Sequence, residues 1–332
     1  MSASSKSAVM FAVGGNSILT VAKFGAFMVS GSGAMLSESI HSLADTANQV
    51  LLMIGIGRSE RPANTAFHYG FGAERFFFAL MSAVGIFVLG CGVTVYHGVH
   101  SLLHPSEIHV GMLDYGVLAF ALVLEGLVLW KALKIVNQER GDQPLLKFLS
   151  TSSDPTLAAV LLEDGVACLG VVIAASGLLL AEMTGNTVYD SVATLLIGLL
   201  LGFVAVWLGY RNRDLILGRA IPKEVQDSVR SYLFEQPSVT TVKTVKTRVL
   251  GAGDFTYSAE IDFDGAYLAE QMLPWVEEQA NVLANPEQRR SFARAFGERM
   301  TYSVATEIDR IEAELRKRHP ELKHLNFEGD PG

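Results

Sequence analysis

Six long apolar segments fill the first two thirds of the chain. Each provides the length of about 20 helical residues that a hydrocarbon core about 30 Å thick requires. Because lipid offers the backbone no hydrogen-bond partner, segments of this kind cross a membrane as helices. We therefore predict an all-α six-helix transmembrane bundle, with spans near Val9–Val29, Met35–Ile56, Phe76–Tyr96, Gly111–Ala132, Ala158–Leu180 and Ser191–Tyr210.

Charged residues divide the chain near Tyr210. Residues 1–210 hold 9 Lys or Arg and 14 Asp or Glu, whereas the shorter stretch 211–332 holds 17 and 20. The net charge of −8, without a basic stripe, makes nucleic acid an unsuitable partner. We predict a transmembrane domain at residues 1–210 and a polar domain at residues 211–332.

The polar domain combines helical and strand patterns. Two segments of alternating polarity flank Gly251–Asp254, a turn sequence typical of a β-hairpin. Helical periodicity comes before and after this hairpin, and a last short strand follows. The predicted elements of this C-terminal α+β domain are a helix at Lys223–Phe234, strands at Thr241–Val249 and Phe255–Phe263, helices at Ala266–Leu283 and Pro286–Arg318, and a strand at Leu325–Glu328.

The positive charges predict the orientation of the bundle, because Lys and Arg near span ends stay on the cytoplasmic side. Apart from Lys23, those of the membrane part lie in the N-terminus, the second-to-third loop and the fourth-to-fifth loop. Both termini and the polar domain should therefore be cytoplasmic, or on the equivalent side of an organelle. The N-terminus carries no Arg-rich amphipathic transit peptide, so we expect a bacterial cytoplasmic membrane.

The second span has a polar face that includes Glu38, His41 and Asp45. Ionisable side chains inside a span usually face a cavity and serve a function. His41 and Asp45 are four residues apart, so their Cβ atoms stack about 5–6 Å apart on one helix face. That spacing suits two ligands of one metal ion. The alternative is that the two side chains hydrogen-bond each other and hold helices together.

Two adjacent carboxylates, Glu163 and Asp164, lie inside the fifth span. Such a pair resists ionisation unless a cation or protons compensate its charge. With His41 and Asp45, the pair supplies a nitrogen and up to three carboxylates, a set that suits Zn²⁺ and also Mn²⁺ or Fe²⁺. The alternative for Glu163 is a position near the membrane interface, turned toward water.

Four stretches of the sequence resemble the cation diffusion facilitator (CDF) family. They are SESIHSLADTANQ in the second span, HYGFGAER in the loop after it, LLEDGVACLGVVIAA in the fifth span and YDSVATLLIGLLLG in the sixth. The resemblance covers nearly the whole chain and is most specific to the branch that contains zinc transporter nine. It implies a homodimer that exchanges Zn²⁺ or a related divalent ion for protons across a lipid bilayer. It also implies that the polar domain is a cytoplasmic αββαβ-like, metallochaperone-like domain for regulation and dimerisation.

The site of that family has His/Asp-xxx-Asp on the second span and His-xxx-Asp on the fifth. His41, Asp45 and Asp164 match this pattern. Val160 stands where the fifth span should carry its first ligand, and a valine cannot bind a metal. Glu163 is the candidate replacement, with Glu38 or a water molecule as the alternative.

From these residues and the resemblance we expect a proton-coupled antiporter of divalent transition-metal ions, with Zn²⁺ efflux as the first candidate. Transport of Mn²⁺, Co²⁺ or Fe²⁺ by the same mechanism is one alternative. A membrane-anchored metal sensor that moves no ion is another. We expect no enzyme, because the zinc-hydrolase pattern H-E-x-x-H is missing from the sequence.

Other polar residues inside the spans have expected roles outside the metal site. Lys23 and Glu125 are candidates for an interhelical pair or a proton relay, with a structural or gating role favoured. Asp190 begins the sixth span, where a carboxylate caps a helix and complements its dipole. Cys91 and Cys168 lie in apolar runs without C-x-x-C spacing, so we expect them to be packing residues.

The remaining histidines give weaker signals. His68, with Glu74 nearby in sequence, is a candidate for a second metal site in a cytoplasmic loop, although a loop histidine is more often simply solvated. The polar domain has only His319 and His324 and no Cys, so we expect no dedicated zinc pair there. His97, His100, His104 and His109 lie in or beside the outer third-to-fourth loop. We expect an ordinary interfacial cluster, with weak capture of external metal as the alternative.

Overall fold

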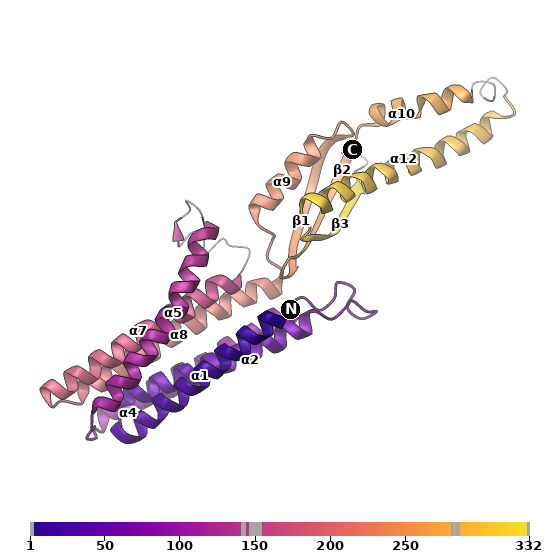
Figure 1. The fold of residues 1–332 in the computed structure, drawn as a ribbon. Coiled ribbons are helices and arrows are strands. Elements are labelled where there is room, and N and C mark those ends of the chain that lie inside the picture. The colour runs from indigo at the N-terminus through magenta and orange to yellow at the C-terminus, as the bar shows by residue number, and fades with distance from the viewer. Residues whose placement is uncertain (1–2, 141–143, 146–154, 280–281, 283–285, 331–332) are drawn as a thin grey trace. The chain divides into compact units, whose positions relative to one another are not determined.

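The structure is a computed structural model that describes residues 3–140, 144–145, 155–279, 282 and 286–330. It divides into two compact units, Met1–Leu217 and Gly218–Gly332. The described part of the first unit is helical, whereas the second combines helices with a small sheet (Figure 1).

Long helices build the first unit. α1 (Ala3–Ser30) and α2 (Gly33–Ser59) lie side by side and are joined by a tight turn. The third predicted span is one continuous helix, in which the π-helical stretch η1 (Ile86–Val93) joins α3 (Glu74–Gly85) to α4 (Thr94–Leu103). The other long helices are α5 (Met112–Arg140), α7 (Pro155–Thr184) and α8 (Val188–Leu217).

Within the described residues, four helices are long and apolar enough to cross a membrane. They are Glu74–Leu103, Met112–Gln138, Leu161–Thr184 and Val188–Leu217, and they correspond to the predicted third to sixth spans. α1 and α2 have similar lengths, 28 and 27 residues, but are not in this set. In α2 the polar face around His41 lowers the mean hydropathy of the helix.

Small residues let the helices of the first unit approach closely. A Cβ atom on Gly202 of α8 would lie 2.8 Å from the Sγ atom of Cys91, and one on Gly177 of α7 would lie 2.4 Å from the Cβ atom of Ala193. Helices in lipid associate largely through such close packing of small side chains. Cys91 therefore packs against α8, in the role that its apolar surroundings in the sequence predict.

The second unit contains a three-stranded sheet in the order β1-β2-β3. β1 (Val239–Gly251) and β2 (Asp254–Phe263) are antiparallel and form the predicted hairpin. Gly253 in its turn has a φ of +63°, a left-handed value that glycine adopts without a steric penalty. β3 (Leu322–Gly329) runs parallel to β2 and is longer than the predicted last strand.

Helices pack on one face of this sheet. The buried residues of β2 alternate along the strand, so they share a face, and they form one apolar cluster with residues of α9 (Lys223–Phe234) and α12 (Arg289–Arg318). α10 (Gly265–Glu278) is shorter than the predicted helix Ala266–Leu283, part of which lies outside the described residues.

A polar contact joins α12 to the start of β1. The carboxylate of Glu307 accepts hydrogen bonds from Ser238 Oγ at 2.5 Å and from Arg310 at 2.8 and 2.9 Å. The hydrogen bonds from Arg310 are the main reason that the pKa of Glu307 lies below its usual value. The contact therefore favours the ionised carboxylate and holds the helix against the sheet.

Candidate metal site

The helix α2 presents a continuous polar row. Glu38, His41, Asp45 and Asn48 follow one another at intervals of three or four residues, so they lie on one helix face. Glu38 is fully buried, and His41 and Asn48 are each 4% exposed. Burial of this row explains why α2 tolerates polar residues, since they face neighbouring helices.

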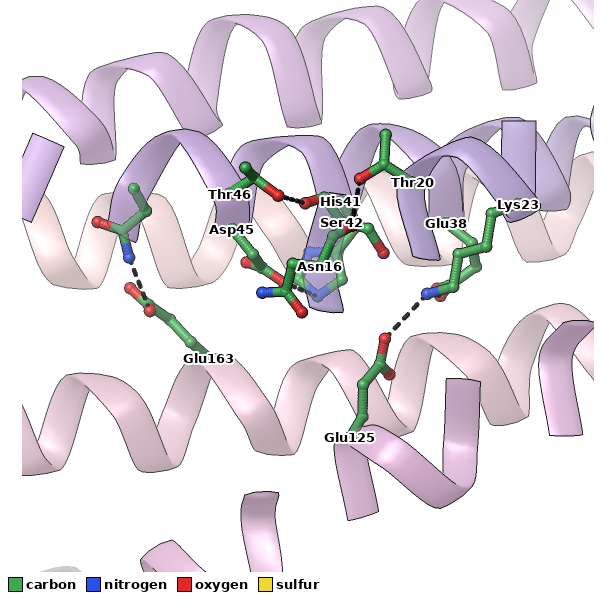
Figure 2. Close-up of polar contacts among 11 residues, drawn as sticks. Asn16, Thr20, Lys23, Glu38, His41, Ser42, Asp45, Thr46, Glu125 and Glu163 are labelled. Carbon is green, nitrogen blue, oxygen red and sulfur yellow. Dashed lines mark hydrogen bonds and ion pairs between the residues drawn. The ribbon is translucent and has the colours of Figure 1, made fainter. Parts of the chain in front are cut away.

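His41 and Asp45 form the pair that their spacing predicts. The Nε2 atom of His41 lies 3.5 Å from Oδ2 of Asp45, which is longer than a good hydrogen bond. Figure 2 shows the two side chains beside each other. Among the described residues, neither ring nitrogen of His41 has a hydrogen-bond partner. The ring nitrogens of His41 are therefore not committed to another described side chain by a hydrogen bond. The interpretation of the pair as metal ligands and the alternative of a hydrogen-bonded pair both stay predictions.

The carboxylates of α7 face the polar row of α2. Glu163 accepts a hydrogen bond of 2.8 Å from Asn48 Nδ2, which joins the two helices. Asp164 is close enough to Asp45 and His41 for their charges to interact. Its Oδ2 atom is buried and has no hydrogen-bond partner within the described part of the chain. A nitrogen and three carboxylates from two helices thus surround one region of the bundle.

These donors are not gathered tightly enough to chelate an ion as they stand. Across the described ranges, no group of three or more His, Cys, Asp or Glu side chains has the geometry of a formed metal site. The donor types nevertheless suit a divalent transition metal, since one imidazole and several carboxylates are hard or borderline ligands. The side chain of Val160 lies outside the described residues. The predicted ligand set His41, Asp45, Asp164 and Glu163 therefore stays a prediction.

Lys23 lies fully buried between two other acidic side chains. Its Nζ atom is 2.9 Å from Oε1 of Glu125, so the predicted interhelical pair is present. The same ammonium lies 2.8 Å from Oε2 of Glu38 (Figure 2). Glu38, the lower-ranked candidate for a fourth ligand, thus already has a cationic partner, and Glu163 is the better placed of the two beside Asp45.

Asp190 of α8 caps α2 instead of the helix that carries it. Its carboxylate accepts hydrogen bonds from Ser32 Oγ at 2.6 Å, Gly33 N at 2.8 Å and Ala34 N at 3.3 Å. The sequence predicts a cap for the sixth span, which carries Asp190, because a sequence cannot show which helix end lies beside a carboxylate. The contact fixes the start of α2, one turn before the polar row.

Removing this cap should destabilise the protein. In Asp190→Ala, buried backbone N–H groups of α2 lose their acceptor, so we expect the free energy of unfolding to fall by about 1–3 kcal/mol. Thermal unfolding of the detergent-solubilised protein measures this loss. Asp190→Asn keeps one acceptor oxygen and should lose less; equal stability of Asp190→Ala and the unaltered protein would contradict the capping role.

The other histidines stand apart from this region. The Nε2 atom of His68 lies 3.1 Å from the carbonyl oxygen of Thr65, and Glu74 pairs with Arg58. Glu74 is therefore paired with Arg58 and does not join His68 as a second candidate metal ligand. At the end of α4, the rings of His100 and His104 stack with centroids 4.8 Å apart.

The two histidines of the second unit have ordinary polar contacts. His319 Nε2 lies 2.9 Å from Ser228 Oγ, and His324 Nε2 lies 3.7 Å from Oδ1 of Asp254. Neither contact brings His319 and His324 together as a zinc pair.

Asn48 is the residue of the site that the sequence predictions missed. It lies three residues after Asp45 and seven after His41, so helical spacing alone places it on the same face. This spacing is the signal that identifies Asn48, whose amide does not ionise and so differs from the other side chains of the row.

The fold and this region define an integral, multi-pass membrane protein with an acidic, histidine-containing site between helices of its bundle. Residues 9–217 match the family described as "Cation efflux transmembrane domain". The chain belongs to this family, that of the cation diffusion facilitators.

Three relatives of the chain have names that refer to metal transport or metal tolerance. The human "Proton-coupled zinc antiporter SLC30A9, mitochondrial" is 39% identical over 327 residues, which is 96% of this chain and 58% of that protein. "Metal tolerance protein C4" of Arabidopsis thaliana is 33% identical over 334 residues, 98% of this chain and 73% of that protein. "Cation-efflux pump FieF" of Pectobacterium atrosepticum is 24% identical over 239 residues, 72% of this chain and 74% of that protein. The chain thus spans little more than half the length of the human relative.

Proposed function

We propose that this protein is a proton-coupled antiporter of divalent transition-metal ions, with Zn²⁺ as its first substrate. The observation that carries the proposal is the pairing of unsatisfied donors across two helices, His41 on α2 and Asp164 on α7. Groups of this kind are costly to bury unless they serve a ligand. The printed name of the human relative, a proton-coupled zinc antiporter, supports the same substrates.

The metal ligands would be His41, Asp45, Asp164 and Glu163. Glu163 replaces the missing ligand at Val160, and its hydrogen bond from Asn48 holds the carboxylate toward α2. The metal would be the transported substrate, so the site would hold it during only part of the cycle.

Proton exchange follows from the chemistry of these ligands. An imidazole and carboxylates must be deprotonated to bind a metal, so metal binding releases protons and acidity favours metal release. Alternating access of the site to the two membrane faces would then exchange a metal ion for protons. No enzymatic step is part of this mechanism.

The membrane topology is part of the proposal. We take α1 and α2 to cross the membrane with the four more apolar helices, because the buried polar row of α2 needs no contact with lipid. Both termini would then lie on the cytoplasmic side, where the loop Lys and Arg residues also lie. The membrane of a bacterial cell stays a prediction from the sequence, and the human relative is named as mitochondrial.

The two units would divide the work. The first, with the polar row and its partners, would transport the ion. The second, with its sheet and two covering helices, would regulate transport and join two copies in a homodimer. Transport of Mn²⁺, Co²⁺ or Fe²⁺ remains the alternative for the substrate, because a carboxylate-rich donor set also suits them.

Transport by purified protein in sealed proteoliposomes tests this function. With an imposed pH difference we expect Zn²⁺ to move against the flow of protons, and we expect the flux to fall when the pH difference is removed. Parallel measurements with Mn²⁺, Co²⁺ and Fe²⁺ identify the preferred metal. A protein that binds zinc without moving it would instead be a sensor, and a flux insensitive to pH would indicate a channel.

A further inference from the structure

A second charged cluster lies within the bundle, beside the candidate metal site. Its members are Lys23 of α1, Glu38 of α2 and Glu125 of α5, which we call the lysine triad. The ammonium lies 2.8 Å from one carboxylate and 2.9 Å from the other. The side chains of Lys23 and Glu38 are 0% exposed and that of Glu125 is 10% exposed. Three helices thus meet at a buried ionic network.

The charges of the lysine triad do not balance when all three groups are ionised. One ammonium and two carboxylates leave a net charge of −1, and an uncompensated buried charge is strongly unfavourable. The second oxygen of each carboxylate, Glu38 Oε1 and Glu125 Oε2, is buried without a hydrogen-bond partner in the described part of the chain. One added proton would neutralise the cluster.

Glu125 is the carboxylate better suited to exchange that proton. Glu38 is fixed from two sides, because Lys23 holds Oε2 and the backbone of α7 approaches Oε1 so closely that a Cβ on Gly170 would lie 2.4 Å away. Glu125 retains some exposure. Glu125 is therefore the less tightly enclosed of the two carboxyl side chains.

The lysine triad and the metal site are close enough to sense each other's charge. Glu125 interacts electrostatically with Lys23 of α1, with Glu38 and His41 of α2, and with Asp164 and Cys168 of α7. A dication among the proposed ligands would repel a proton held on Glu125. Removal of the dication would favour the return of that proton.

We propose that the Lys23–Glu38–Glu125 triad is a proton-binding site distinct from the metal ligands, in which Glu125 carries one proton of the exchange cycle. When the metal leaves, hydronium donates a proton to Oε2 of Glu125 and an O–H bond forms. When a metal binds, this O–H bond breaks and the proton returns to water. The inference rests on the proposed antiport, since it assigns one of the protons to a particular group.

Glu125→Gln tests the assignment in the full-length protein. Glutamine imitates the protonated carboxyl and leaves Lys23 paired with Glu38, so the fold should be kept. In proteoliposomes we expect zinc binding and zinc flux down a zinc gradient to stay within about twofold of the unaltered protein, while the protons moved per zinc fall by about one. An internal pH dye and a zinc dye, read together, give this ratio. Glu182→Gln, which changes an exposed carboxyl of α7, is the matched control and should leave the ratio unchanged.

Two results would overturn the inference. An unchanged proton-to-zinc ratio in Glu125→Gln would show that the carried protons reside elsewhere, and loss of zinc binding would make Glu125 part of the metal site.

If the variant does not fold, infrared difference spectra of the unaltered protein replace it. Zinc binding should remove the C=O band of a buried protonated carboxyl, and absence of that change contradicts the proposal. If the unaltered protein itself moves zinc without protons, the proposed antiport is wrong. This outcome differs from one in which the unaltered protein exchanges protons for zinc and the proton-to-zinc ratio is the same in Glu125→Gln.

Discussion

Replacing His41 with alanine should abolish transport and lower zinc affinity by at least about 100-fold. Removing a residue that hydrogen-bonds to a metal ligand typically lowers metal affinity or activity by about 10–100-fold. Removing the ligand itself should lower zinc affinity further. His41 has no hydrogen-bond partner within the described residues, so its loss should leave no neighbouring donor or acceptor unsatisfied. Zinc affinity is measured by competition with a chromophoric chelator, and transport by zinc uptake into proteoliposomes. Asp45→Ala should give the same loss.

His68→Ala is the control for this experiment. His68 lies in an exposed loop and contacts the carbonyl of Thr65, so its removal deletes a histidine without touching the polar row. We expect its affinity and flux to match those of the unaltered protein. Normal zinc transport by both His41→Ala and Asp45→Ala would remove the proposed site altogether.

Replacing Lys23 with methionine should cause the largest loss of stability. Without the ammonium, Glu38 and Glu125 remain as two buried carboxylates with no counter-ion, and breaking a buried ion pair in this way typically costs about 3–5 kcal/mol. The loss would appear as a lower unfolding temperature in detergent. Lys131→Met, on an exposed position of α5, serves as the control and should have little effect.

A compensating variant separates charge from packing. When Lys23→Met is combined with Glu38→Gln and Glu125→Gln, no uncompensated charge remains, and replacing a whole buried network can be nearly neutral. We therefore expect the triple variant to recover most of the lost stability. If Lys23→Met alone were as stable as the unaltered protein, the ion pairs at 2.8 and 2.9 Å would contribute nothing to the fold.

Local features of the sequence were sufficient to predict the elements of the fold. The apolar spans and the turn at Gly251–Asp254 depend on neighbours in the chain, and the structure contains the corresponding helices and hairpin. α1 and α2 are the exceptions to the hydropathy rule, and in α2 a polar face lowers the mean hydropathy of the helix. That face is buried against neighbouring helices, which the hydropathy of one segment does not reveal.

Contacts between distant residues could not be predicted in the same way. Lys23 and Glu125 are 102 positions apart, and the sequence offered them only as candidates for a pair. The inclusion of Glu38 and the capping of α2 by Asp190 depend on how helices pack, which no spacing along one helix reveals. Conversely, His41 and Asp45 lie on one helix, so their contact followed from a four-residue interval.

Anomalous diffraction at the zinc edge, from crystals grown with zinc, tests most directly whether α2 and α7 hold one ion between them. We expect a single strong peak in the bundle, about 2.0–2.2 Å from a ring nitrogen of His41 and from carboxylate oxygens of Asp45 and Asp164. A bundle without zinc between these two helices, in crystals of protein that transports zinc, would contradict the proposed site.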